Sequence, residues 1–132
     1  MTGKRISEVA FAKLVVRDLD AMAAFYRAVC GYGDGQRIED AIAGKPVVEI
    51  VFGKSEGGAE LVLLTYTDGP APSPSGVMIV FNTPDLEAFQ TRVLAAGGSV
   101  MDPIKTLEFG GNRMRIGIFA DIEGYVLEAL ER

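Results

Sequence analysis

The stretch Lys13-Leu14-Val15-Val16-Arg17-Asp18-Leu19-Asp20-Ala21-Met22-Ala23-Ala24-Phe25-Tyr26 contains the pattern from which the fold of this chain can be worked out. Apolar residues alternate through its first part, which predicts a strand over residues 9–17. Asp18 then supplies a side chain that can cap a helix, and apolar residues recur at helical spacing as far as Val29. Gly31 stands where a helix C-terminal glycine belongs. We therefore expect a strand joined to an amphipathic helix.

The same plan returns 67 residues later. Asp18-Leu19 is matched by Asp85-Leu86, although the second helix is expected to begin with Thr83 as its cap and Pro84 in its first position. The ordered agreement favours a duplicated β-α-β-β-β unit over an unrelated α+β sandwich with chance matches. The offset also relates Ala21 to Ala88, Gly31 to Gly98, Gly44 to Gly111 and Phe52 to Phe119. Further strands are expected at residues 34–42, 47–52, 59–66, 77–82, 99–107, 113–119 and 125–130.

The chain is expected to form one domain over residues 1–132. Module one covers about residues 8–66 and module two about residues 77–131. Between them, residues 67–76 carry three prolines at alternate positions, which favours an extended, semi-rigid connector.

Composition excludes several classes of function. The chain has no histidine, so His-based zinc sites, Ser-His-Asp triads and Cys-His nucleophile pairs are ruled out, and its single cysteine excludes an internal disulfide. The net charge of −5 comes without a basic cluster, so no nucleic-acid partner is expected. No run approaches ~18 consecutive apolar residues, so no membrane span is expected. One cysteine and no export signal predict a cytoplasmic protein.

The opening stretch and Asp121-Ile122-Glu123-Gly124-Tyr125-Val126-Leu127-Glu128 together resemble the vicinal-oxygen-chelate superfamily. This superfamily includes glyoxalase I, bleomycin-resistance proteins, fosfomycin-resistance enzymes and extradiol dioxygenases. The resemblance covers about residues 8–131. It implies an α+β fold in which two βαβββ modules form a curved mixed sheet around a cleft, with the helices on the outer face. It also implies a homodimer, in which modules of different chains can share one cleft.

In metal-dependent relatives the cleft ligands are a His or Gln on the first strand, a Glu on the fourth, a His on the fifth and a Glu on the eighth. The resemblance puts these positions at Phe11, Leu63, Val77 and Glu128, with Glu60 in place of Leu63 if the hairpin is shifted by one residue. One carboxylate among apolar side chains cannot replace the hydration shell of a divalent cation, and Glu60 would add only a second. No metal or other cofactor is therefore expected, and lactoylglutathione-lyase, fosfomycin-transferase and dioxygenase chemistry is not expected either.

Strand alternation predicts which residues point into the cleft. It gives an apolar and partly aromatic cleft with the charges Lys13, Arg115 and Glu128, although Lys13 would equally well extend out of its mouth. Glu49 is unexplained, because the offset pairs it with Ile116, which is expected to face a helix; either that strand is shifted or Glu49 faces an interface. The predicted inward residues are Phe11, Lys13, Val15, Val77, Ile79, Phe81, Arg113, Arg115, Gly117, Phe119, Val126, Glu128 and Leu130. The predicted ligand-binding set is Phe11, Lys13, Leu63, Val77, Ile79, Arg115, Phe119 and Glu128.

Three functions remain open from the sequence. The first is a metal-free small-molecule-binding protein, similar to the bleomycin-resistance branch, with a hydrophobic or aromatic ligand in the cleft. The second is a metal-independent isomerase, lyase or hydrolase in which Glu128 is the general base and Lys13 or Arg115 stabilises developing negative charge. The third is a domain that acts through protein contacts alone. Glu128 itself is a catalytic base, a ligand-binding group or a relic neutralised by Arg115 or Lys13.

Overall fold

A computed structural model describes residues 3, 6–7, 9–54, 56–69 and 73–131. Within these residues, eight strands form two four-stranded mixed sheets, ordered β1-β4-β3-β2 and β5-β8-β7-β6, and two helices accompany them. In each sheet the first and last strands of the module pair in parallel and the other neighbours are antiparallel. The expected α+β fold of two βαβββ modules is therefore confirmed. The elements are β1 (Ala12–Val15), α1 (Leu19–Cys30), β2 (Gln36–Ile42), β3 (Lys45–Gly53), β4 (Ala59–Tyr66), β5 (Ile79–Asn82), α2 (Leu86–Ala95), β6 (Ser99–Phe109), β7 (Asn112–Ala120) and β8 (Val126–Glu131).

The 67-residue repeat extends to the hydrogen bonds that cap the two helices. The carboxylate of Asp18 accepts the backbone N–H of Ala21 at 3.1 Å, and that of Asp85 accepts the N–H of Ala88 at 3.0 Å. The prediction that Thr83 caps α2 is wrong, because the N-cap is Asp85. A carboxylate three residues before the donor N–H satisfies the helix end in both modules. Of the connector, Pro70 and Pro72 lie outside the described residues.

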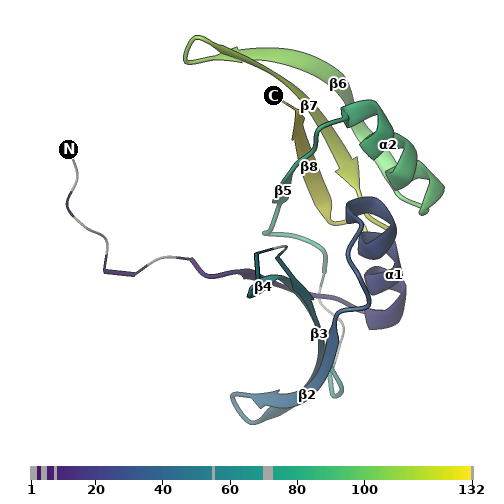
Figure 1. Cartoon of the computed structure of the whole chain (residues 1–132). Coiled ribbons are helices and arrows are strands. Elements are labelled where there is room, and N and C mark those ends of the chain that lie inside the picture. Colours follow the sequence, from purple (N-terminus) through teal and green to yellow (C-terminus); the bar gives the residue numbers. More distant parts are fainter. Residues whose placement is uncertain (1–2, 4–5, 8, 55, 70–72, 132) are drawn as a thin grey trace.

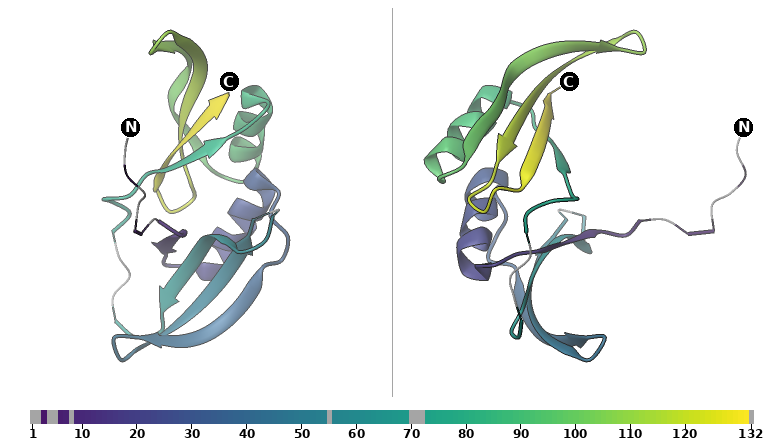
Figure 2. Two further views of the ribbon diagram at one scale, coloured as in Figure 1. Left: turned by 60° about the vertical axis from the view of Figure 1, so that its left-hand side comes forward. Right: turned by 180° about the vertical axis from the view of Figure 1, so that it is seen from behind.

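The two helices lie side by side on one side of both sheets (Figure 1, Figure 2). A row of aromatic rings runs through this layer from one module to the other: Tyr26 on α1 packs on Phe81 of β5, with ring centroids 6.1 Å apart. Phe81 in turn packs on Phe89 of α2, and Phe89 on Phe119 of β7, at 6.1 and 5.6 Å. Pairs of this kind stabilise by about 0.5–1.5 kcal/mol beyond the area they bury. The modules therefore share one hydrophobic core.

The turn between β7 and β8 anchors module two to the start of α1. Buried Asp121 accepts a hydrogen bond from the hydroxyl of Tyr26 at 2.7 Å. The carboxylate of Glu123 accepts the backbone N–H groups of Arg17 and Asp18 at 2.8 and 2.7 Å. Burial raises the pKa of Asp121. The hydrogen bonds of Asp121 and Glu123 attach the turn of module two to module one.

Within the part of the chain that the model describes, neither helix has the length and apolar character required to cross a bilayer.

Candidate functional site

Each sheet has one face toward the helices and one face away from them, which we call the open face. The strands curve so that the open faces lie on the concave side of the ribbon (Figure 1, Figure 2). Side chains on the helix side belong to the common core, and alternate residues belong to the open faces. Core positions include Leu14, Ile50, Phe52, Leu61, Leu63, Ile79, Phe81, Phe119, Leu127 and Ala129. Open-face positions are Lys13, Val15, Val47, Glu49, Val51, Val62 and Leu64 in the first sheet, and Val80, Ile116, Ile118, Val126, Glu128 and Leu130 in the second.

Glu128 lies near the middle of the second open face. Strand pairing places Val80 of β5 on one side of it and Ile118 of β7 on the other. The side chain is partly exposed. Among the described residues, no hydrogen bond or ion pair involves its carboxylate, so a ligand that contacts this face meets a carboxylate flanked by two apolar side chains.

Lys13 and Glu49 form an ion pair on the first open face. The Lys13 ammonium nitrogen lies 2.9 Å from the Glu49 carboxylate, whose side chain is only 6% exposed, whereas that of Lys13 is 39% exposed. Glu49 is therefore explained by its pairing with Lys13, and neither a shifted strand nor an interface is needed. Its counterpart Ile116 also lies on an open face, so the expectation that Ile116 packs under a helix is wrong.

Four members of the predicted ligand-binding set do not face the concave side. Leu63 and Phe119 have no exposed surface and lie in the core, and Ile79 packs against it. Arg115 shares their side of the sheet. In β5 the expected facing was wrong because both alternating sets are apolar, as at Val80 and Phe81. In β7 the set with Arg115 is the more polar one, but Glu87 and Glu131 pair with Arg115, so this set can face the helices. Alternation then cannot tell which set faces a helix. Three further residues that were predicted to point inward lie on the helix side in the same way: Phe81, Gly117 and Arg113.

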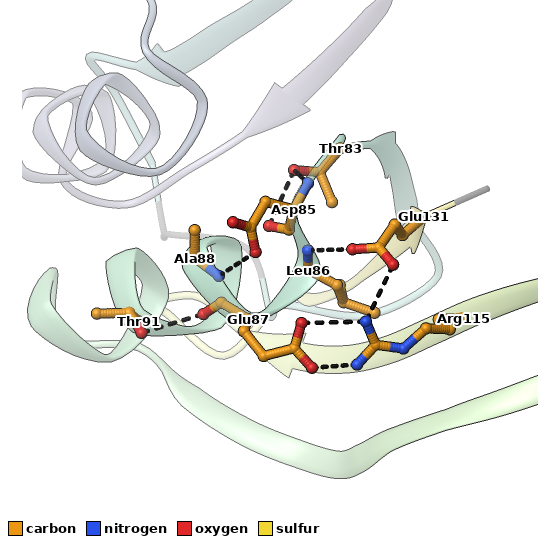
Figure 3. A network of polar contacts seen from close by, with 8 residues as sticks. All are labelled: Thr83, Asp85, Leu86, Glu87, Ala88, Thr91, Arg115 and Glu131. Carbon is orange, nitrogen blue, oxygen red and sulfur yellow. Dashed lines mark hydrogen bonds and ion pairs between the residues drawn. The ribbon is translucent and has the colours of Figure 1, made fainter.

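Arg115 belongs to a polar network at the start of α2 (Figure 3). Its guanidinium pairs with Glu87 of α2 and, at 3.0 Å, with Glu131 of β8. Glu131 also accepts the backbone N–H of Leu86 at 2.8 Å, so the network attaches α2 to the ends of β7 and β8. The hydrogen bond from Arg115 lowers the pKa of Glu87. Asp85, Glu87 and Glu131 have oxygens within 4.8 Å of one another, but each already accepts a hydrogen bond from the protein.

Two predicted residues lie just before edge strands. Phe11 precedes β1 and is 40% exposed, and Val77 lies two residues before β5 and is 48% exposed. Of the eight residues, then, Lys13 and Glu128 lie on open faces, and Phe11 and Val77 are exposed beside them.

The register of the parallel pairs corrects the fourth-strand ligand position. Lys13 pairs with Val62, and Val80, 67 residues after Lys13, pairs with Glu128. Val62 is therefore the counterpart of Glu128, in place of the expected Leu63. Glu60, the alternative position, instead accepts a hydrogen bond from the hydroxyl of Tyr32.

The donors at these positions do not fit a divalent metal ion. Phe11, Val62 and Val77 offer no ligand atom, and Glu128 offers one carboxylate. The nearest addition on the open faces, Glu49, is engaged by Lys13. A catalytic cation requires three or more convergent donors, so no reaction step through a metal follows from this set.

Several residues that define the open faces were missed from the sequence, namely Val62, Val80 and Ile118. Glu128 and Lys13, which were among the predicted residues, lie on the same faces. The parallel pairing that sets Val80 beside Glu128 and Val62 beside Lys13 was needed to extend the face from one strand to the next.

Comparisons with known proteins agree with this architecture. The family model described as Glyoxalase/Bleomycin resistance protein/Dioxygenase superfamily matches residues 5–129. A glyoxalase family protein from Bacillus cereus is similar in structure, with a TM-score of 0.80 at 15% identity, over 99% of this chain and 97% of that one. A glyoxylase/bleomycin resistance protein/dioxygenase domain from Frankia sp. EAN1pec gives a TM-score of 0.72 at 21% identity, over 96% and 98% of the two chains.

A glyoxalase/bleomycin resistance protein from Albidiferax ferrireducens T118 gives a TM-score of 0.66 at 21% identity, over 96% of this chain and 100% of that one. No curated protein matches the sequence. At these identities the solved structures establish the fold, while the family model covers nearly the whole chain. The chain therefore belongs to the Glyoxalase/Bleomycin resistance protein/Dioxygenase superfamily.

Proposed function

We propose that the chain binds a hydrophobic or aromatic small molecule on its open faces, without a metal ion. The observation that carries the proposal is Glu128, a partly exposed carboxylate between Val80 and Ile118 with no partner among the described residues. An apolar surface with one placed polar group is typical of sites for small organic ligands. An ionised carboxylate accepts hydrogen bonds, so the ligand would carry a hydroxyl or N–H donor on a flat apolar body.

The catalytic alternative loses support from the geometry. It requires a cation that stabilises negative charge developing near Glu128. Arg115 is on the other face and is held by Glu87 and Glu131, and Lys13 is paired with Glu49. Binding without turnover requires neither cation, and for this reason we favour it.

We also propose that the chain forms a homodimer that completes the ligand site. Exposed apolar residues gather at both edge strands: Val9 and Phe11 lead into β1, and Val77, Met78 and Val80 lie at or before β5. A second copy that covered these edges would bury the apolar residues and pair the free strand edges. Sedimentation velocity would show a dimer at micromolar concentration, and a monomer at every concentration tested would contradict the proposal.

We further propose a cytoplasmic location, because nothing in the chain calls for an oxidising compartment. Cys30 is free, and burial raises the pKa of its thiol to about 12, so it remains protonated and unreactive. Localisation of a tagged copy of the chain in its native cell would test this.

Ligand binding can be tested with flat aromatic hydroxyl compounds, of which 2-naphthol is the first probe. We expect wild-type protein to bind it in isothermal titration calorimetry, with no change after treatment with EDTA. Glu128→Gln removes the charge from the hydrogen bond and should weaken binding by roughly tenfold or more, as a charge-assisted bond is worth about 1.5–3 kcal/mol.

Glu39→Gln is the matched control, because Glu39 is an exposed carboxylate on β2. It should bind as the wild type does. The proposal would be contradicted if the wild type did not bind 2-naphthol or other flat aromatic hydroxyl compounds. It would also be contradicted if Glu128→Gln and Glu39→Gln lost the same amount of affinity. Release of product by the wild type but not by Glu128→Gln would instead support catalysis.

A further inference from the structure

A hollow lies where the two modules meet, beside the edge strands β1 and β5. It has a volume of about 360 Å³ and lies between the beginning of β4 and strand β5. Its wall includes Tyr32, Glu60, Leu61, Ile79 and Phe81, of which Leu61, Ile79 and Phe81 are on the helix side of their sheets. We call it the junction hollow. Glu128 and Ile118 are not part of its lining, although Val80 is, so the hollow adjoins the ligand face proposed above at the edge strand β5 and is centred on a different carboxylate.

Glu60 is the one charged side chain that lines the junction hollow. No ion pair among the described residues neutralises it. One carboxylate oxygen, Oε2, accepts a hydrogen bond from the hydroxyl of Tyr32, and the other has no hydrogen-bond donor among the described residues. The side-chain amide of Asn82 is the remaining uncharged polar group on the same wall. The hollow therefore presents a carboxylate on an otherwise apolar and aromatic surface.

The carboxylate of Glu60 is held in place by a rigid neighbour. The ring of Tyr32 stacks on Phe52, with centroids 4.5 Å apart and planes within 5°. Burial, and then the hydrogen bond to Glu60, raise the pKa of Tyr32, so its hydroxyl remains a donor. A group oriented in this way before a ligand arrives loses less entropy when the ligand binds.

Arg92 is a cation at a neighbouring hollow. Arg92 lines a smaller hollow of about 180 Å³, which also includes Glu60 and Phe81, but not the junction hollow itself. Its Nε donates to the carbonyl of Val29 at 2.9 Å, and its guanidinium lies 5.8 Å from the ring centre of Phe89. These contacts engage Arg92, and among the described residues it forms no hydrogen bond or ion pair with Glu60.

We propose that the junction hollow binds a small organic cation, with its ammonium group paired to Glu60 and its apolar body against Leu61, Ile79 and Phe81. A carboxylate next to aromatic rings is the chemistry that selects an ammonium group over a neutral or anionic one. The volume is within the range of small-molecule sites. Because the wall contains residues of both modules, an occupant would stabilise their contact.

The probe is 2-phenylethylammonium chloride, compared with 2-phenylethanol and phenylacetate, which have similar bodies and different charges. We expect the cation alone to bind in NMR titrations, with the largest shifts at Tyr32, Asn82 and Phe81. Glu60→Gln should weaken binding by about tenfold or more. Glu56→Gln, at an exposed position in the preceding turn, is the matched control and should leave the affinity unchanged.

Two further variants separate this site from the ligand face. Glu128→Gln should leave binding of 2-phenylethylammonium unchanged. Tyr32→Phe keeps the ring but removes the hydroxyl, and should weaken binding while the unfolding temperature shows that the protein remains folded. No binding at millimolar concentration would overturn the proposal. So would equal binding of the alcohol, or shifts centred on Ile118 and Val126, which are open-face residues outside the junction hollow.

Discussion

Loss of the Lys13 side chain should destabilise the protein far more than loss of its partner Glu49. In Lys13→Val, the carboxylate of Glu49, on a side chain that is 6% exposed, is left without its cation. Breaking a fully buried pair in this way costs about 3–5 kcal/mol, and a lost charge-assisted hydrogen bond about 1.5–3 kcal/mol. Because the side chain of Lys13 is 39% exposed, water can partly replace it. We expect a loss of about 2–3 kcal/mol of unfolding free energy.

The reverse substitution differs because Lys13 has access to solvent. In Glu49→Ile its long side chain can extend into water, so the change should stay within about 1 kcal/mol. Module two already carries the apolar version of this pair at the equivalent positions, Val80 and Ile116. The double variant Lys13→Val with Glu49→Ile should therefore recover wild-type stability or exceed it.

Urea unfolding of the four proteins at pH 7 measures this double-mutant cycle, with the midpoint compared at a constant slope. In thermal unfolding, Lys13→Val alone should lower the midpoint by roughly 6–15 °C for a domain of this size. This prediction would be contradicted if Lys13→Val and Glu49→Ile lost equal amounts of unfolding free energy, or if the double variant were less stable than Lys13→Val.

Three further predictions concern the core, the helix cap and the buried carboxyl. Phe119→Ala removes a fully buried ring and should cost about 3–5 kcal/mol in urea unfolding. Asp85→Ala should cost about 1 kcal/mol and Thr83→Ala less, because only Asp85 caps α2. Burial raises the folded-state pKa of Asp121 above its ordinary value of 3.8, so its contribution to stability is full at lower pH and is lost as pH rises through the raised pKa. The stability of the wild type minus that of Asp121→Asn, measured from about pH 3.5 to 7, should fall as pH rises.

Local signals in the sequence predicted the elements of the fold well. Asp18 and Gly31 mark the ends of α1, and the structure has the helix between them. At α2 two local signals disagreed: Thr83 followed by Pro84 has the form of a cap, whereas the repeat indicated Asp85. The repeat was correct, because in both modules the N–H three residues after the Asp needs a hydrogen-bond acceptor, and the Asp side chain supplies it.

The facing of module two could not be predicted in the same way. Strand β5 offers Val80 on one face and Phe81 on the other, and either could line a cleft. Arg115 was expected in an open cleft because its two partners could not be identified from the sequence. These partners, Glu87 and Glu131, are distant from it along the chain. The facing of β5 and the facing of Arg115 both depend on contacts between elements that are distant in sequence. The periodicity of a single strand does not give these contacts.

NMR of the methyl groups distinguishes metal-free binding of an apolar ligand beside Glu128 from binding elsewhere on the protein. The protein would be titrated with 2-naphthol in the presence of EDTA. We predict that the methyl signals of Val80, Ile118 and Val126 shift and that those of Leu63 and Leu127, on the helix side, do not. Shifts confined to the helix side, or binding that EDTA abolishes and a divalent cation restores, would contradict the account.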